Sequence, residues 1–283
     1  MNHIQTIGVL GCGWLGLPLA KAFVAQGIRV HGSTTQVAKL ETLAQAGIVP
    51  FHIQLNPLPE GDDLQAFLDV AVLVIDIPPT QPPHYTPQAG SPPWHAQQIQ
   101  HLVSKIKQSG VQSVVYISST SVYPNTNTWV DEQTPVAESN SDLDKGLVAA
   151  EKLIQTLHPT QNWAILRCGG LLGYNRVPGK YFAGRKNLPN GDNPVNFIFR
   201  DDAVQIIQQV IAKQAWQEIF NVVAPEHPTR KLIYAHNAQQ LGFEAPTFAN
   251  QSTEPYKIVS CQKVIQQLDY QFAYPNPLHF RYE

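Results

Sequence analysis

A short apolar strand that runs directly into a glycine-rich turn constrains this chain more than any other feature. Residues 7–16 are Ile-Gly-Val-Leu-Gly-Cys-Gly-Trp-Leu-Gly, and the apolar spacing from Leu17 to Val24 predicts a helix. A strand, a Gly-x-Gly-x-x-Gly turn and a helix in this order are typical of the turn that binds the pyrophosphate of a dinucleotide. The alternative is an ordinary glycine-rich connection between a strand and a helix.

Each glycine of this turn has a separate physical task. Gly11 lets the chain leave the strand sharply, Gly13 lets a pyrophosphate approach the backbone because it has no Cβ atom, and Gly16 lets the helix pack close to the sheet. The phosphates would lie at the helix N-terminus, where unpaired N–H groups point toward them. The predicted cofactor-binding turn comprises Gly11, Gly13, Trp14, Leu15 and Gly16.

Strand and helix patterns alternate along the first half of the chain. The stretches 71–77 and 114–118 are almost continuously apolar, as expected for strands buried on both faces of a parallel sheet. The alternation predicts an α/β fold, a Rossmann-type doubly wound parallel sheet with a small C-terminal substrate cap. We expect residues 1–168 to form the dinucleotide-binding domain and 169–283 the smaller cap, with 197–223 returning to the sheet. Strands are expected at 4–10, 28–32, 48–53, 71–77, 114–118, 164–167 and 219–223, and helices at 14–26, 37–46, 64–68, 94–108, 142–157, 201–213, 229–241 and 260–267.

The composition excludes several classes of partner. The chain has 283 residues, of which 43% are hydrophobic and 14% charged, and its formal net charge is −2. It carries no run of like charge and no apolar stretch of membrane-spanning length, which argues against nucleic-acid and membrane partners. Its cysteines, Cys12, Cys168 and Cys261, are scattered without a Cys-x-x-Cys pair. We therefore expect a cytoplasmic protein with neither a disulfide framework nor a metal site.

Further motifs follow the glycine turn in a recognisable order. They are Ile-Ser-Ser-Thr-Ser-Val-Tyr at 117–123, Asp-Glu-Gln-Thr-Pro at 131–135, Ala-Ala-Glu at 149–151, Leu-Arg at 166–167 with Leu-Gly at 172–173, Asn-Phe-Ile at 196–198 with Asp-Asp-Ala at 201–203, and Phe-Asn-Val-Val at 220–223. This ordered set resembles the extended short-chain dehydrogenases/reductases, in the NAD(P)-dependent epimerase/dehydratase branch. The resemblance implies an oxidoreductase or epimerase that acts on a sugar nucleotide or another polar carbonyl or alcohol.

The resemblance also implies an active site of a serine, a tyrosine and a lysine, with the last two spaced Tyr-x-x-x-Lys on one helix face. There the lysine lowers the pKa of the phenol, which acts as general acid or base. Ser119 occupies the serine position, and Ser118 is expected near the cofactor. Leu143 and Leu147, however, occupy the tyrosine and lysine positions. The glycine turn departs as well, since this branch normally has Gly-x-x-Gly-x-x-Gly. The chain therefore resembles the atypical members that lack the standard active site.

The segment at the second strand bears on which cofactor is bound. NAD sites usually place an acidic residue there for the ribose hydroxyls, and residues 31–40 contain none. The hydroxyls of Ser33, Thr34 and Thr35 would hold a 2′-phosphate instead, with Lys39 nearby. This pattern favours NADP and leaves NAD open.

Loops that follow the strands supply further candidates. Pro78 and Pro79 begin a proline-rich stretch directly after a strand, so we place them among the cofactor contacts, although the stretch is equally consistent with a plain surface loop. In the expected cap, Tyr181 lies between Arg176 and Arg185, whose guanidinium groups would bind a substrate phosphate. The alternative for these three residues is a solvated loop.

Two functions stay open. If the chain is an enzyme, Ser119 would orient the reacting oxygen and a non-standard residue would move the proton, and Tyr123 is the catalytic candidate beside it. Other candidates for the proton are Tyr174, Tyr181 and His95, and His84 lies in the same proline-rich region as His95. The alternative is an NAD(P)-binding redox sensor or scaffold without catalysis, which the two leucines favour. Either protein would be a monomer or a homodimer with a small-molecule ligand.

Overall fold

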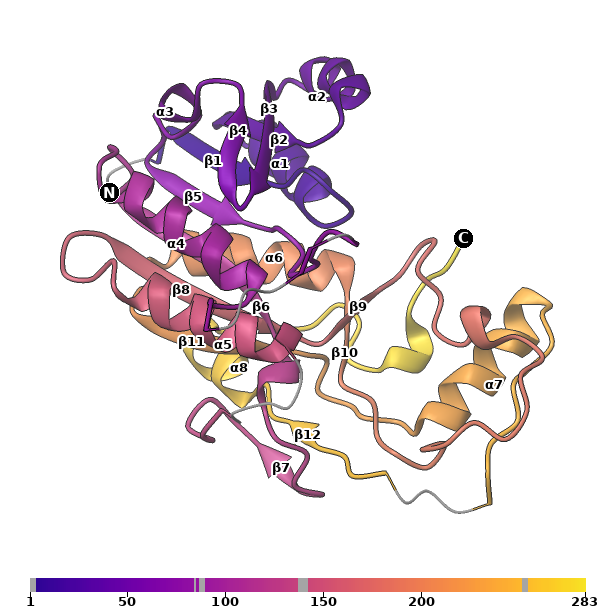
Figure 1. Cartoon of the computed structure of the whole chain (residues 1–283). Helices are drawn as coiled ribbons and strands as arrows, with labels where there is room; N and C mark the ends of the chain where they lie inside the picture. Colours follow the sequence, from indigo (N-terminus) through magenta and orange to yellow (C-terminus); the bar gives the residue numbers. More distant parts are fainter. Residues whose placement is uncertain (1–3, 84, 87–89, 137–141, 251–253) are drawn as a thin grey trace. The chain divides into compact units, whose positions relative to one another are not determined.

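The computed structural model of the chain describes residues 4–83, 85–86, 90–136, 142–250 and 254–283 (Figure 1). The chain forms two compact units, each assembled from several segments. The first unit comprises residues 1–118, 138–166 and 214–219, and the second comprises 119–137, 167–213 and 220–283. Three of the boundaries between the two units fall inside strands, so no single linker separates the units.

An eight-stranded sheet has the strand order β11-β8-β6-β5-β1-β2-β3-β4. The pairs from β6 through β5, β1 and β2 to β3 run parallel, and β4 pairs antiparallel with β3. The order reverses beside β1, because β2 and β3 follow on one side of it and β5 and β6 on the other. In open α/β sheets, such a reversal opens a crevice at the carboxyl ends of the strands. The strands are β1 Thr6–Leu10, β2 Arg29–Thr34, β3 Val49–Asn56, β4 Leu58–Gly61, β5 Val72–Ile75, β6 Ser113–Ser119, β8 Asn162–Cys168 and β11 Glu218–Val222.

The interior strands of the first unit are buried on both faces. All four residues of β5 are buried, but only Leu73 and Ile75 belong to the core cluster that contains the inner residues of α4 (Trp94–Ile106) and α5 (Asp142–Gln155). Since successive side chains of a strand point to opposite faces, the other two residues face the opposite layer. Helix α1 (Gly16–Ala25) buries Leu19 and Phe23 outside that cluster. The sheet is therefore doubly wound, as the alternating pattern predicts.

Short helices of the first unit lie beside its sheet. Helix α2 (Leu40–Gln45) is preceded by a single 3₁₀ turn at Val37–Lys39, and α3 (Leu64–Phe67) is capped by the carboxylate of Asp63. Helices α4 and α5 lie side by side in Figure 1. The helix bounds agree with the expected ones to within two residues at most positions.

The second unit has little sheet. Besides the ends of β6, β8 and β11, its described residues form two parallel strand pairs, β9 with β10 and β7 with β12. The buried carboxylate of Asp202 accepts hydrogen bonds from the Tyr270 hydroxyl and from the backbone N–H groups of Ala273 and Tyr274, which fixes the C-terminal segment against α6. The elements are β7 Trp129–Val130, β9 Gly170–Leu172, β10 Phe197–Phe199, β12 Ile258–Val259, α6 Arg200–Ala212, α7 Arg230–Leu241 and α8 Gln262–Leu268.

Two differences from the expected elements matter for the site. Strand β2 continues to Thr34, so that Ser33 and Thr34 are buried strand residues and not part of the following loop. Strand β4, at Leu58–Gly61, was not expected because Pro57 and Pro59 flank and interrupt it, and prolines are tolerated only at a sheet edge.

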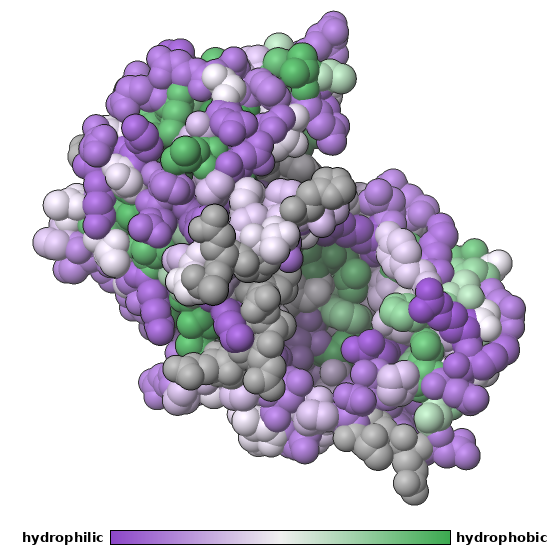
Figure 2. All heavy atoms as spheres, viewed as in Figure 1, coloured by the Kyte–Doolittle hydropathy of each residue, from purple (hydrophilic) through white to green (hydrophobic). Residues whose placement is uncertain are grey.

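The face of the molecule in Figure 2 is mostly polar. Hydrophilic side chains predominate on the face shown in Figure 2, and apolar residues form separate patches. In the part of the chain that the structure describes, no helix combines the length and the apolar character that crossing a bilayer requires.

Candidate functional site

The glycine turn between β1 and α1 has a separate steric environment at each of its glycines. Gly11 has a φ of +105°, and a Cβ atom there would lie 2.2 Å from the Asp76 carbonyl oxygen. A Cβ atom at Gly16 would lie 2.1 Å from the Gly11 carbonyl oxygen. A Cβ atom at Gly13, in contrast, would meet no atom within 4 Å. The backbone itself thus requires glycine at 11 and 16, whereas Gly13 borders open space.

Strand β2 holds this turn in place. The Gly11 N–H donates to Ser33 Oγ at 2.9 Å, and the Cys12 N–H donates to the Ser33 carbonyl at 2.7 Å. Burial, and secondarily the Asp76 carboxylate, raises the pKa of the Cys12 thiol to about 12, so this thiol stays protonated. Ser33 therefore supports the glycine turn directly, and its oxygen is already an acceptor within the protein.

A cavity of about 290 Å³ lies beside the turn, at the carboxyl ends of β1, β2, β3 and β5. It brings together five residues predicted from the sequence, namely Gly11, Ser33, Thr34, Thr35 and Pro78. Pro79, Trp14 and Leu15 are not among the residues that line it. The other lining residues are Leu10, Ile53, Gln54, Leu55, Asn56, Ile77, Thr80 and Gln98.

None of the described residues that line this cavity is charged. It therefore offers neither a carboxylate to a ribose diol nor a guanidinium group to a 2′-phosphate. The Thr34 hydroxyl accepts from the Gln36 N–H at 3.2 Å, while Thr35 is exposed. Lys39, in the 3₁₀ turn that follows, is also exposed.

Sequence reasoning missed the polar residues Gln54, Asn56, Thr80 and Gln98 of this cavity. Asn56 ends β3, so the rule that ligands bind at the carboxyl ends of strands was sufficient to flag it. Gln98 is a buried polar residue on the apolar face of α4, and a polar residue in such a stripe was the available signal. For Thr80 there was no signal beyond its place in the proline-rich stretch.

The second unit contains a closed network around Tyr123, which is 2% exposed. The Tyr123 hydroxyl donates to Asn221 Oδ1 at 2.8 Å and accepts from Arg167 Nη1 at 2.8 Å. The Arg167 guanidinium also lies 4.8 Å from the centre of the Tyr123 ring. Burial raises the pKa of Tyr123 to about 12, against the opposing effect of Arg167. This geometry favours a structural role for Tyr123 over proton transfer.

The same network joins most of the motifs found in the sequence. The Asn221 side chain donates to the Ser260 carbonyl at 3.1 Å, and its backbone N–H donates to Glu132 Oε1 at 2.7 Å. Lys257 Nζ donates to the Tyr123 carbonyl at 2.6 Å. Burial raises the pKa of Glu132. Glu132, Arg167 and Asn221 belong to sequence motifs to which the sequence assigns no role. In the structure they support one another within this network.

The predicted catalytic serine caps a turn. Ser119 Oγ accepts from the Ser121 N–H at 3.1 Å, and the Ser119 side chain is half-buried. Its neighbour Ser118 belongs to the first unit, is buried, and donates to Glu151 Oε1 at 2.6 Å. Ser118 thus has an internal partner, and its contact with a cofactor stays a prediction.

Helix α5 carries the two positions at which the related active sites have tyrosine and lysine. Leu147, at the lysine position, is 2% exposed and lies one turn before the buried Glu151. Leu143 lies in the same helix, and its side chain is outside the described residues. An apolar, buried Leu147 has no means of assisting proton transfer. His84, the histidine of the proline-rich stretch, also falls outside the described residues.

The three cap residues lie at the surface of the second unit. Tyr181 is 76% exposed and lies in the 3₁₀ turn Lys180–Phe182. Arg185 is exposed and its guanidinium lies over the Phe182 ring at 5.3 Å, and Arg176 is exposed too. Their contact with a substrate stays a prediction.

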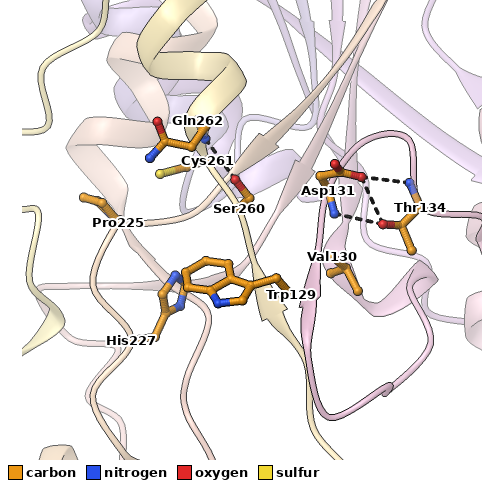
Figure 3. A pocket seen from close by; sticks show the side chains of 9 residues that line it. All are labelled: Trp129, Val130, Asp131, Thr134, Pro225, His227, Ser260, Cys261 and Gln262. Atoms are coloured by element: carbon orange, nitrogen blue, oxygen red, sulfur yellow. Dashed lines mark hydrogen bonds between the residues drawn. The ribbon is translucent and has the colours of Figure 1, made fainter.

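A second cavity, of about 450 Å³, lies within the second unit (Figure 3). The Trp129 and His227 rings meet edge to face on one side of it, with centroids 5.4 Å apart. Asp131 closes a local turn by accepting from Thr134 on another side. Sequence reasoning assigned nothing to this cavity. Within the described ranges, no group of three or more His, Cys, Asp or Glu side chains is arranged to hold a metal ion.

A doubly wound parallel sheet with a phosphate-type glycine turn at its reversal point defines a Rossmann-type α/β protein. The profile of the NAD dependent epimerase/dehydratase family matches residues 7–223, and the chain belongs to this family. Protein YeeZ of Escherichia coli (strain K12) is 32% identical over 280 residues, which cover 97% of this chain and 98% of YeeZ. The resemblance inferred from the ordered motifs is therefore confirmed.

Solved structures share the fold. A conserved protein of unknown function from Silicibacter pomeroyi DSS superposes with a TM-score of 0.75 at 23% identity, over 97% of this chain and 95% of that one. MoeE5 in complex with UDP-glucuronic acid and NAD gives 0.78 at 16% identity, over 98% and 97%. UDP-glucuronic acid 4-epimerase from Bacillus cereus in complex with NAD gives 0.77 at 18% identity, over 98% and 94%.

Proposed function

We propose that this chain is an NADP-binding oxidoreductase of the epimerase/dehydratase type with a non-standard active site. The observation that carries the proposal is the glycine turn, in which two glycines are required by the backbone and the third borders open space. The residues present fit a dinucleotide: the backbone at Gly13 would take the pyrophosphate at the start of α1, and the uncharged cavity would take the adenosine end. A bound nicotinamide would supply hydride transfer.

The preference for NADP over NAD rests on the absence of a carboxylate from the described lining of the cavity. The exposed Thr35 and Lys39 support it, because a hydroxyl and an ammonium group suit a 2′-phosphate. The internal hydrogen bonds of Ser33 and Thr34 weaken it. A direct comparison of the two cofactors is therefore the measurement that decides between them.

A sugar nucleotide is the substrate class that the relatives support. MoeE5 was solved with UDP-glucose and with UDP-glucuronic acid, and both complexes contain NAD. In this chain the exposed Arg176 and Arg185 would bind the phosphates, and Ser119 would orient the reacting hydroxyl or carbonyl. The polar carbonyl or alcohol itself stays unspecified.

Turnover tests the enzymatic proposal. We expect the protein to oxidise NADPH with at least one keto sugar, or to reduce NADP⁺ or epimerise the sugar with at least one nucleotide-linked sugar, and Ser119→Ala to lower that rate. Ser121→Ala is the matched control, since its side chain neither caps the turn nor occupies the predicted serine position. An equal rate of turnover by Ser119→Ala would remove Ser119 from the chemistry, and neither cofactor turnover nor a changed sugar product across the panel would contradict catalysis.

One observation favours a second function, an NADP-binding redox sensor or scaffold without catalysis. The lysine position holds a leucine that is 2% exposed, and the phenol nearest Ser119 in sequence is closed into a buried network. A sensor requires that NADP⁺ and NADPH shift its oligomeric state or partner binding differently. Sedimentation with each cofactor form measures this, and identical behaviour in both would contradict the sensor.

A further inference from the structure

A buried chain of hydrogen bonds ends at the cavity beside the glycine turn. Its members are Tyr116 on β6, His95 and Gln98 on α4, and the Leu55 carbonyl on β3. All three side chains are buried, and Gln98, which is 8% exposed, is the one that lines the cavity. The chain lies wholly within the first unit and includes no residue of the sequence motifs.

The Leu55 carbonyl fixes the direction of every bond in this chain. Because a carbonyl only accepts, Gln98 Nε2 donates to it at 2.7 Å, which turns Gln98 Oε1 toward His95 Nδ1 at 3.1 Å. His95 Nδ1 therefore carries the proton and donates to Gln98. The unprotonated Nε2 of His95 accepts from the Tyr116 hydroxyl at 2.7 Å.

Neither titratable member of the chain ionises near neutral pH. Burial lowers the pKa of His95 to about 4, against the opposing effect of Gln98. Burial, with the Glu151 carboxylate second, raises the pKa of Tyr116 well above its usual value. The direction of the chain is therefore constant, and the Gln98 amide is held in one orientation.

That orientation determines what Gln98 offers to the cavity. Its Oε1 and one N–H bond within the protein, and among the described residues no partner is found for the second N–H. Because Gln98 lines the cavity, this second N–H is available to donate to a ligand, beside the remaining lone pair of Oε1. The walls of the cavity include Leu10, Ile53 and Ile77, which suit the faces of a flat heterocycle. The ring nitrogens of a purine are acceptors that match a donor at its edge.

We propose that Gln98 recognises the purine base of the bound nucleotide, and that His95 and Tyr116 are positioning residues that restrain its amide in the orientation set by the Leu55 carbonyl. This inference rests on the proposed function, because it takes the cavity to be the adenosine end of a dinucleotide site. Base recognition by a donor whose rotation is prevented is specific, since an amide that is free to flip presents a donor and an acceptor equally.

The test compares two ligands that differ only by the base, adenosine 5′-monophosphate and ribose 5-phosphate. Gln98→Met should weaken the binding of adenosine 5′-monophosphate by about three- to tenfold, the contribution of one hydrogen bond, and leave the binding of ribose 5-phosphate unchanged. Gln97→Met is the matched control on the same helix, because Gln97 bonds to Tyr85 and Pro92 and does not line the cavity. NMR-detected titration measures all six affinities.

The outcomes separate this inference from the proposed function. Equal affinity of wild type and Gln98→Met for adenosine 5′-monophosphate, or an equal loss for ribose 5-phosphate, would overturn the inference, and so would no binding by the wild type. Wild type that binds adenosine 5′-monophosphate through Gln98 but binds no NAD(P) dinucleotide would contradict the proposed function and leave the inference intact.

A second variant keeps the test valid if Gln98→Met does not fold. Tyr116→Phe removes the hydrogen bond that anchors His95 Nε2, so that His95 restrains Gln98 less firmly and the Leu55 carbonyl alone holds the Gln98 amide. We expect a smaller loss of affinity for adenosine 5′-monophosphate than in Gln98→Met, and none for ribose 5-phosphate. A general loosening of the fold would lower both affinities together. Unchanged binding of adenosine 5′-monophosphate by Tyr116→Phe would overturn the positioning role.

Discussion

The glycine turn and the Tyr123 network both carry motifs of one family, yet they differ in what their residues leave open. In the turn, Gly13 borders open space and the adjacent cavity has polar groups along it. In the network, Tyr123 and Asn221 are buried and bond to each other and to their neighbours. Motif resemblance alone therefore does not distinguish a region with open space for a ligand from one whose residues support one another.

The largest expected effect comes from Gly11→Ala, which tests whether the turn is held by its backbone. Its positive φ and a contact of 2.2 Å with the Asp76 carbonyl should lower the free energy of unfolding by about 3–5 kcal/mol. Gly13→Ala is the matched control and should change the free energy of unfolding by less than about 1 kcal/mol, since nothing lies within 4 Å. Urea unfolding measures both, and equal losses would contradict the assignment of open space to Gly13.

Asn221→Ala tests whether the second region is a support. The Tyr123 hydroxyl loses its acceptor and the Ser260 carbonyl loses its donor within the buried network. We therefore expect the free energy of unfolding to fall by roughly 2–4 kcal/mol. Asn125→Ala, at an exposed position of the same unit, should be nearly neutral. A stability of Asn221→Ala close to that of Asn125→Ala would show that the network is not needed for the fold.

The pH dependence of stability tests the buried histidine of the first region. The pKa of His95 falls from 6.5 to about 4 on folding, because burial disfavours its charged form. Between these values the unfolded chain binds more protons, so the free energy of unfolding rises with pH through this window. His95 should account for a loss of at most about 3 kcal/mol as the pH falls from 6.5 to about 4. Urea unfolding across this window should give a flatter profile for His95→Asn, and an equal slope would contradict the buried, neutral state.

The smallest expected effect separates the two regions most sharply. Tyr123→Phe removes one hydroxyl and should lower the free energy of unfolding by about 1–2 kcal/mol. Its affinity for NADPH should equal that of the wild type, because the phenol is buried, protonated and engaged within the network. A tenfold loss of NADPH affinity at unchanged stability would assign Tyr123 to the ligand site instead.

The sequence predicts the sheet of the first unit closely, because buried parallel strands are continuously apolar, as at Val72–Ile75. Helix ends are predicted as well, because glycine readily adopts the left-handed conformation that ends a helix. Gly27 and Gly47 follow helices with φ of +78° and +77°. The cavity was predicted only in part. The lining residues that the sequence predicts lie in the turn, in β2 and directly after strands. Gln98, in contrast, is held at the cavity by a tertiary hydrogen bond to Leu55, 43 positions away. No local pattern contains such a bond.

Calorimetric titration of the wild type and of Gly13→Asp with NADPH, NADP⁺, NADH and NAD⁺ tests the central claim most directly. We predict micromolar binding of at least one dinucleotide, with NADPH or NADP⁺ the tighter ligand, and its loss in Gly13→Asp, where a carboxylate would occupy the open space and repel the pyrophosphate. Binding that survives in Gly13→Asp, or no binding of any of the four by the wild type, would contradict the assignment of the glycine turn as a dinucleotide site.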